Sequence, residues 1–118
     1  MARLKLSIVL ASGARFGPGK AALLESIRDT GSISAAARGM GMSYKRAWLL
    51  LDSINRAFEE PAVTAAIGGL HGGGARLTDF GRDLLDRYRR MEVRAGSEFA
   101  DDLAALEAAA RPTAGPKV

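Results

Sequence analysis

The segment SISAAARGMGMSYKRAW, residues 32–48, restricts the fold more than any other part of this sequence. Helices that cross closely need small residues where they touch, and a tight turn between them favours glycine. Ala36 and Ala37 fit such a contact, and Gly41 fits such a turn. Four further positions that must face inward are apolar: Met40, Met42, Ala47 and Leu50. Counted from Ile33, this pattern predicts a helix-turn-helix.

The second helix of this pair begins with an unusual set of side chains. Ser43 can cap it, and if Ala47 and Leu50 face inward, its other side is polar and aromatic. The candidate DNA contacts there are Ser43, Tyr44, Lys45, Arg46 and Trp48. The DNA major groove admits a helix whose first residues reach base edges, so Lys45 or Arg46 can bind guanine, while serine and tyrosine can bind phosphates or bases. Trp48 either packs under a neighbouring hairpin or contacts the DNA backbone, and a solvated basic helix start is the alternative for the whole set.

Patterning also predicts the elements that precede this pair. Residues 4–10 alternate between apolar and mostly polar side chains, which is typical of a strand. Residues 11–20 form a turn region, in which Pro18 begins a helix because its missing N–H costs nothing there. This helix runs to about Thr30, where Gly31 stops it.

Serine residues are expected to cap both helices of the pair. Either Ser32 or Ser34 caps the first helix, which ends at Arg38, and both serines are also candidate DNA contacts. The second helix runs from its cap at Ser43 to about Phe58.

A hairpin with a long loop is predicted next, because two strand-like stretches, residues 62–67 and 75–78, flank the glycine-rich residues 68–74. The glycines allow this tip, or wing, to approach a phosphate backbone closely. The candidate contacts in the wing are His71, Gly72, Gly73 and Arg76. A mobile loop without such a role is the alternative.

A last helix is predicted from Asp79 to about Ala109, with Thr78 as its cap. Its apolar residues recur every three or four positions and form one continuous stripe. They are Phe80, Leu84, Tyr88, Met91, Ala95, Phe99, Leu103, Leu106 and Ala110. Thirty residues at about 1.5 Å each span about 45 Å, which is longer than a domain of this size can cover. The part beyond Met91 is therefore expected to form a homodimer, and Gly96 is a position at which the helix can bend.

Length and charge limit the possible architectures and partners. A chain of 118 residues without cysteine supports one domain, here residues 1–110, followed by a disordered tail at 111–118. The net charge is +4, and the first 95 residues hold 15 lysines and arginines against nine acidic residues, which favours a polyanion such as double-stranded DNA as partner. No apolar run reaches the roughly 18 residues that span a bilayer, so we expect a cytoplasmic protein that does not enter membranes.

The sequence lacks the motifs that catalysis or cofactor binding would require. GPGK at 17–20 lacks the earlier glycine and the Ser or Thr after Lys20 that a phosphate loop requires. His71 is the single histidine, so a histidine cluster for a metal is excluded. The aspartates of the last helix suit a solvated helix face. We therefore expect no catalytic residue, metal or cofactor.

Several of these motifs resemble those of a known family. The stretch GSISAAARGMGMSYKRAWLLLDSIN, followed by GGLHGGGARLTDFGRDLL, is similar to the DNA-binding half of the molybdate-responsive ModE regulators, and more distantly to LysR-type regulators. The resemblance spans about residues 4–106. It implies a dimeric winged helix-turn-helix whose recognition helix starts at residues 43–48, whose wing is residues 62–77, and whose last helix, 79–109, dimerises.

The resemblance also has a limit. ModE regulators carry a second, molybdate-binding region after this domain, and the residues up to Val118 offer no counterpart. Oxyanion sensing is therefore not expected of any residue here, and a small effector stays unknown. The sequence predicts a mainly α fold with a small β-wing and a transcriptional regulator that binds specific DNA sequences. The alternative is a winged-helix module that binds another protein.

Overall fold

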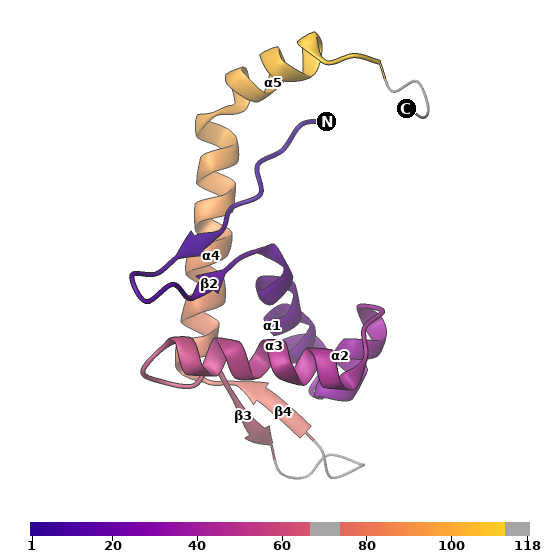
Figure 1. Cartoon of the computed structure of the whole chain (residues 1–118), viewed down its shortest axis with the longest axis vertical. Helices are drawn as coiled ribbons and strands as arrows, with labels where there is room; N and C mark the ends of the chain where they lie inside the picture. Colours follow the sequence, from indigo (N-terminus) through magenta and orange to yellow (C-terminus); the bar gives the residue numbers. More distant parts are fainter. Residues whose placement is uncertain (67–73, 113–118) are drawn as a thin grey trace.

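A computed structural model describes residues 1–66 and 74–112, and these form a helical body from which one long helix projects (Figure 1). Two short antiparallel sheets accompany the helices. The elements in chain order are β1 (Ile8–Val9), β2 (Arg15–Phe16), α1 (Pro18–Thr30), α2 (Ile33–Gly39), α3 (Tyr44–Ala57), β3 (Val63–Ala66), β4 (Gly74–Leu77), α4 (Asp79–Glu98) and α5 (Ala100–Ala109). Within the described residues, no helix combines the length and the apolarity needed to cross a membrane.

The body is built around the three helices α1, α2 and α3, as the sequence pattern predicts. Ala36, Ala37 and Ala47 are buried at the crossing of α2 and α3, and Gly41 turns the chain between them at a φ of 68°. Positive φ strains residues with a side chain, so the glycine is required there. Ile33, Met40, Met42 and Leu50 pack half-buried around this core. The predicted helix-turn-helix is confirmed.

Ala37 provides a direct test of this close crossing. Replacing Ala37 by leucine adds three carbon atoms at a fully packed contact and is expected to cost about 1–3 kcal/mol of folding free energy. The neighbouring Arg38 is exposed on the same helix, so Arg38→Leu is a matched control that should leave the midpoint of urea unfolding nearly unchanged. Equal midpoints for the two variants would contradict this packing.

The wing is attached to the body at two places. Ala75 N donates to Gly31 O at 2.9 Å, which joins β4 to the connection between α1 and α2. Asn55 of α3 holds the other strand: its Oδ1 accepts from Ala62 N at 2.8 Å, and its Nδ2 donates to Val63 O at 3.2 Å. The base of the wing therefore has a fixed position relative to α3.

The start of α4 is fixed by a local network around Thr78. The Thr78 hydroxyl accepts from Gly81 N at 2.9 Å and donates to Pro61 O at 2.7 Å, while Thr78 N donates to Ala62 O at 2.9 Å. Gly81 is buried directly against Ala62. The motif LTDFG thus serves to dock α4 onto the start of the wing.

The predicted strand over residues 4–10 is wrong in its extent. Only Ile8–Val9 pairs, and its partner Arg15–Phe16 lies in the region expected to be a turn. Gly13, at a φ of 94°, closes this short hairpin. The earlier residues instead follow α4, where the buried Tyr88 donates its hydroxyl to Leu6 O at 2.7 Å. Burial raises the pKa of the Tyr88 hydroxyl, which favours this protonated donor form.

The predicted single helix over 79–109 is divided into α4 and α5 at Phe99, where φ is −104° and ψ is 19°. Gly96 lies inside α4, three residues before the break. Asp101 and Asp102 follow immediately, and acidic residues stabilise a helix N-terminus. A new helix start after Phe99 therefore competes with continuation of α4.

Candidate DNA-binding surface

The first turn of α3 is held by its own cap. The Ser43 backbone is extended, and its Oγ accepts a hydrogen bond from Arg46 N at 3.1 Å. This bond satisfies one of the free N–H groups at the start of the helix. The Ser43 hydroxyl thus has a structural partner, and the helix start presents the side chains that follow it.

Those side chains lie on the outward side of α3. Tyr44 is 54% exposed and Trp48 is 46% exposed, while Lys45 and Arg46 are also exposed. In contrast Ala47, between them in sequence, is fully buried. The structure therefore brings the four predicted contacts of α3 together on one accessible surface, which we call the α3 surface. Trp48 does not pack into the core.

Leu49 also belongs to the α3 surface and was missed by the sequence reasoning. It is 51% exposed although it stands within the apolar run LLL, at 49–51. Its neighbour Leu51 is buried and Leu50 half-buried. The sequence could have revealed its exposure. Leu49 lies two residues after the buried Ala47, and two residues turn a helix by about 200°, so the two side chains point to nearly opposite sides.

The cations of the α3 surface are not engaged in ion pairs. Across residues 1–66 and 74–112, no salt bridge includes Lys45 or Arg46. At the other end of the same helix, Arg56 pairs with Asp52 at 3.2 Å. Among the described residues, Lys45 and Arg46 are thus the cations of α3 that can bind an anion without first breaking an ion pair.

The two serines at the start of α2 differ in role. Of the two predicted caps, Ser32 is the one used, because its Oγ accepts from Ala35 N at 2.8 Å. Its backbone also bridges to Gly74 of the wing. Ser34 is exposed in the first turn of α2. Ser32 therefore acts in the structure as a cap and a wing attachment, and Ser34 has the more accessible side chain.

The wing contributes one described candidate. Arg76 is exposed and pairs across the hairpin with Thr64, on the sheet face opposite the buried Ala75 and Leu77. It lines a groove of about 400 Å³ together with Thr64, Leu77, Thr78, Asp79 and Arg82, none of which belongs to α3. The predicted contacts His71, Gly72 and Gly73 lie outside the described residues.

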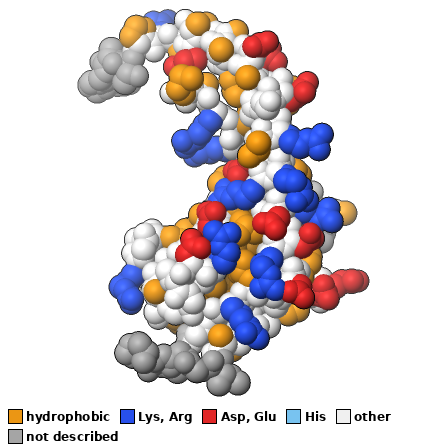
Figure 2. Space-filling view, turned by 180° about the vertical axis from the view of Figure 1, so that it is seen from behind, with side chains coloured by type: hydrophobic (Ala, Val, Ile, Leu, Met, Phe, Trp, Pro, Cys, Tyr) orange, Lys and Arg blue, Asp and Glu red, His pale blue; other side chains and the backbone are white. Residues whose placement is uncertain are grey.

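Some arginines of α4 form ion pairs with carboxylates. Arg89 bonds Glu25 of α1 at 2.8 Å and Glu92 at 2.7 Å, and Arg87 bonds Asp83 at 2.8 Å. These bonds raise the pKa of both guanidinium groups. Figure 2 shows basic and acidic side chains interspersed along this helix. The basic charge of α4 is therefore less concentrated than that at the start of α3.

Comparison with known proteins identifies relatives. No protein-family model matches the chain. The molybdenum-pterin-binding protein MopB of Rhodobacter capsulatus is 51% identical over 82 residues, which are 70% of this chain and 30% of that protein. The molybdenum transport protein ModE of Azotobacter vinelandii is 45% identical over 71 residues, 60% of this chain and 26% of that protein.

A third relative has a name that states a role. The DNA-binding transcriptional dual regulator ModE of Escherichia coli K12 is 38% identical over 88 residues, 72% of this chain and 34% of that protein. The chain thus spans about a third or less of the length of the curated relatives it matches.

Proposed function

We propose that this chain, a homologue of the N-terminal region of ModE regulators and Mop proteins, is a sequence-specific transcriptional regulator that binds double-stranded DNA. It acts in the cytoplasm as a homodimer and catalyses no reaction. The single observation that carries the proposal is the α3 surface, where Lys45 and Arg46 stand exposed in the first turn of a capped helix and form no ion pair with any residue that the structure describes. The name of the Escherichia coli relative supports the same role.

The proposed binding mode follows from the geometry of α3. Its first turns enter the major groove, where Lys45 or Arg46 binds guanine O6 and N7. Leu49 and Trp48 offer apolar contact to thymine methyl groups or to the sugar backbone. Ser34 and Arg76 would bind phosphates beside the groove, together with His71, Gly72 and Gly73 of the wing. Phosphate contacts fix the position, and base contacts select the sequence.

Removal of the two cations tests this binding mode. Lys45→Ala and Arg46→Ala are each expected to weaken specific binding by about 1–3 kcal/mol where the side chain reads a base. Their thermal stability should stay unchanged, because both side chains are exposed. The matched control is Arg56→Ala, which removes an exposed arginine from the far end of the same helix. Affinity for an operator selected from genomic DNA is measured for all three variants.

Two results would contradict the assignment of α3. One is full operator affinity in the Lys45→Ala, Arg46→Ala double variant. The other is an equal loss in the Arg56→Ala control, because the effect would then reflect total charge rather than position.

A second candidate function rests on the apolar part of the same surface. Tyr44, Trp48 and Leu49 are all about half exposed, and aromatic residues are enriched in the centres of protein interfaces. The α3 surface would then bind another protein. DNA binding falls steeply as salt rises, because counterions are released from the phosphates. Binding to duplex DNA that does not change between low and high salt, or that is absent, would favour the protein partner.

A further inference from the structure

The exposed side chains of α3 differ in how directly they face away from the body. Ala47 is fully buried on the inward side, and a helix turns by about 100° per residue. Lys45 and Leu49 each lie two residues from Ala47, or about 200°, so both point almost straight outward. Arg46 and Trp48 each lie one residue from Ala47, or about 100°, so they point to either side. We call Lys45 and Leu49 the crest of α3, and Arg46 and Trp48 its flanks.

The two flanks can be distinguished by the attachments of α3 to the body. Seven residues, or about two turns, place side chains on the same flank. Asn55, seven residues after Trp48, hydrogen-bonds to the backbone at the start of the wing. Ser53, seven residues after Arg46, accepts from Lys20 Nζ of α1 at 2.9 Å. Trp48 therefore lies on the wing side of α3 and Arg46 on the α1 side, with the crest between them.

The crest combines one cation with one apolar side chain. Lys45 and Leu49 are neighbours one turn apart, both are exposed, and Lys45 forms no ion pair with any residue that the structure describes. The next outward residues are Asp52 and Arg56, which pair with each other at 3.2 Å. The carboxylate of Asp52 is repelled by phosphates. The part of the outward side that suits DNA is therefore short and ends at Leu49.

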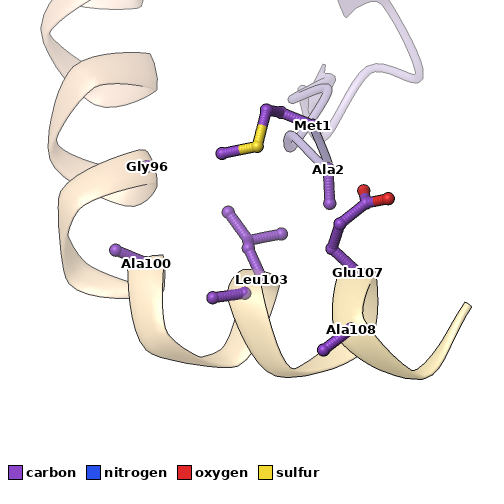
Figure 3. Close-up of a pocket in the computed structure, with 8 residues that line it drawn as sticks. Met1, Ala2, Gly96, Ala100, Leu103, Glu107 and Ala108 are labelled. Atoms are coloured by element: carbon purple, nitrogen blue, oxygen red, sulfur yellow. The ribbon is translucent and has the colours of Figure 1, made fainter.

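The crest projects from the body, whereas grooves of the molecule are built from other elements. The groove in Figure 3, of about 410 Å³, is lined by Met1, Ala2 and residues of α4 and α5, and Leu103 points into it. The groove beside Arg76 also lacks α3 residues. A projecting ridge requires a ligand that supplies the concave surface. The DNA major groove, about 12 Å wide, admits an α-helix and presents base edges to it.

We propose that the crest selects the DNA sequence while the flanks hold the DNA backbone. Lys45 binds guanine O6 and N7, and Leu49 contacts the C5 methyl group of a thymine. Arg46 and Trp48 contact the sugar-phosphate walls on the two sides of the groove. Four helical residues rise about 6 Å, close to two base-pair steps of about 3.4 Å, so the two bases lie within about two base pairs. This inference rests on the proposed function for DNA binding and adds which residues read bases.

Removal of single methyl groups from the DNA tests the role of Leu49 in the full chain. Each thymine of an operator selected from genomic DNA is replaced in turn by deoxyuridine, which lacks the C5 methyl group. At one position the wild type should lose about fourfold in affinity, as expected for one buried carbon group. Leu49→Ala should bind the unmodified operator more weakly and lose nothing further at that position. Leu49→Met keeps an apolar side chain and should retain part of the sensitivity.

The same design tests Lys45. In 7-deazaguanine the N7 acceptor is absent, so this base should weaken wild-type binding about tenfold at one guanine, because a hydrogen bond from a charged donor is lost. That guanine should lie within about two base pairs of the sensitive thymine. Lys45→Ala should show no further loss there.

The flanks supply the matched controls. Trp48→Ala also removes an exposed apolar side chain, and Arg46→Ala also removes an exposed cation. Both should weaken binding, but their losses should add to those of deoxyuridine and 7-deazaguanine, because independent contacts are additive. Affinities are measured by fluorescence anisotropy at one salt concentration. Circular dichroism should show that all variants are folded, since the replaced side chains are about half or more exposed.

The results separate the crest from DNA binding itself. An operator in which no thymine couples to Leu49, or in which Trp48 couples instead, would overturn the inference and leave the proposed function standing. Coupling of the sensitive guanine to Arg46 rather than Lys45 would do the same. A wild type that binds no duplex DNA would reject the proposed function and the inference with it. Coupling of Leu49 to one thymine and of Lys45 to a nearby guanine would support both.

Discussion

Replacing Gly81 by alanine is expected to destabilise the protein by about 3 kcal/mol, at the upper end of the usual range for overpacking. A Cβ at this position would lie 2.0 Å from Ala62 O and 2.9 Å from Ala62 C. Both are backbone atoms, and Ala62 O already accepts from Thr78 N at 2.9 Å. The clash therefore cannot be relieved by rotation of a side chain. Either α4 must leave the body or the start of the wing must move.

A matched glycine shows whether the effect is local. Gly19 lies in the first turn of α1, and a Cβ there would meet nothing within 4 Å. Gly19→Ala should be neutral or slightly stabilising, because alanine has the higher helix propensity. The measurement is the midpoint of urea unfolding for both variants. A Gly81→Ala protein that unfolds at the wild-type midpoint would show that α4 does not contact Ala62 as described.

The helix-turn-helix could be predicted because each of its constraints is local. The close crossing requires small residues, here Ala36 and Ala37, and the turn requires Gly41. The local geometry can therefore be predicted from the residue types alone. The N-terminal strand could not be delimited in the same way. The alternation of apolar and polar residues fits a strand, but Leu6 O accepts a hydrogen bond from the hydroxyl of Tyr88, 82 residues away. Such a long-range contact has no counterpart in local periodicity.

The candidate site was predictable to a similar degree. The exposure of Lys45 and Arg46 follows from the burial of Ala47 through helix geometry. Leu49 was not among the predicted contacts, although it lies two residues, or about 200° of helix rotation, from the inward-facing Ala47. Arg76 was predicted as a contact from its place beside the glycines. Its side chain lines a groove that is shared with α4, and the sequence alone does not show this because it depends on how the strands pair and pack.

Ending the chain after Arg94 is expected to weaken operator binding by about 100-fold or more, because two linked sites gain this much over one. The fold should survive: among the described residues, none that is buried in the core lies beyond Tyr88. The shortened chain lacks α5 and Phe99, so it should sediment as a monomer. Circular dichroism of the shortened chain should show the helix content of the full chain less that of the removed residues, which would confirm that the body stays folded while association is lost.

A dimer of this kind also predicts the symmetry of the DNA site. A two-fold dimer sets two copies of α3 about one DNA turn apart, roughly 34 Å, or a multiple of it, and the operator should then be an inverted repeat. A DNA fragment with one half-site should bind the full and the shortened chain with similar affinity, because only one α3 is used. Only the complete repeat should distinguish them. A shortened chain that remains dimeric would place the contact within residues 1–94, where the N-terminal residues beside Tyr88 are the next surface to examine.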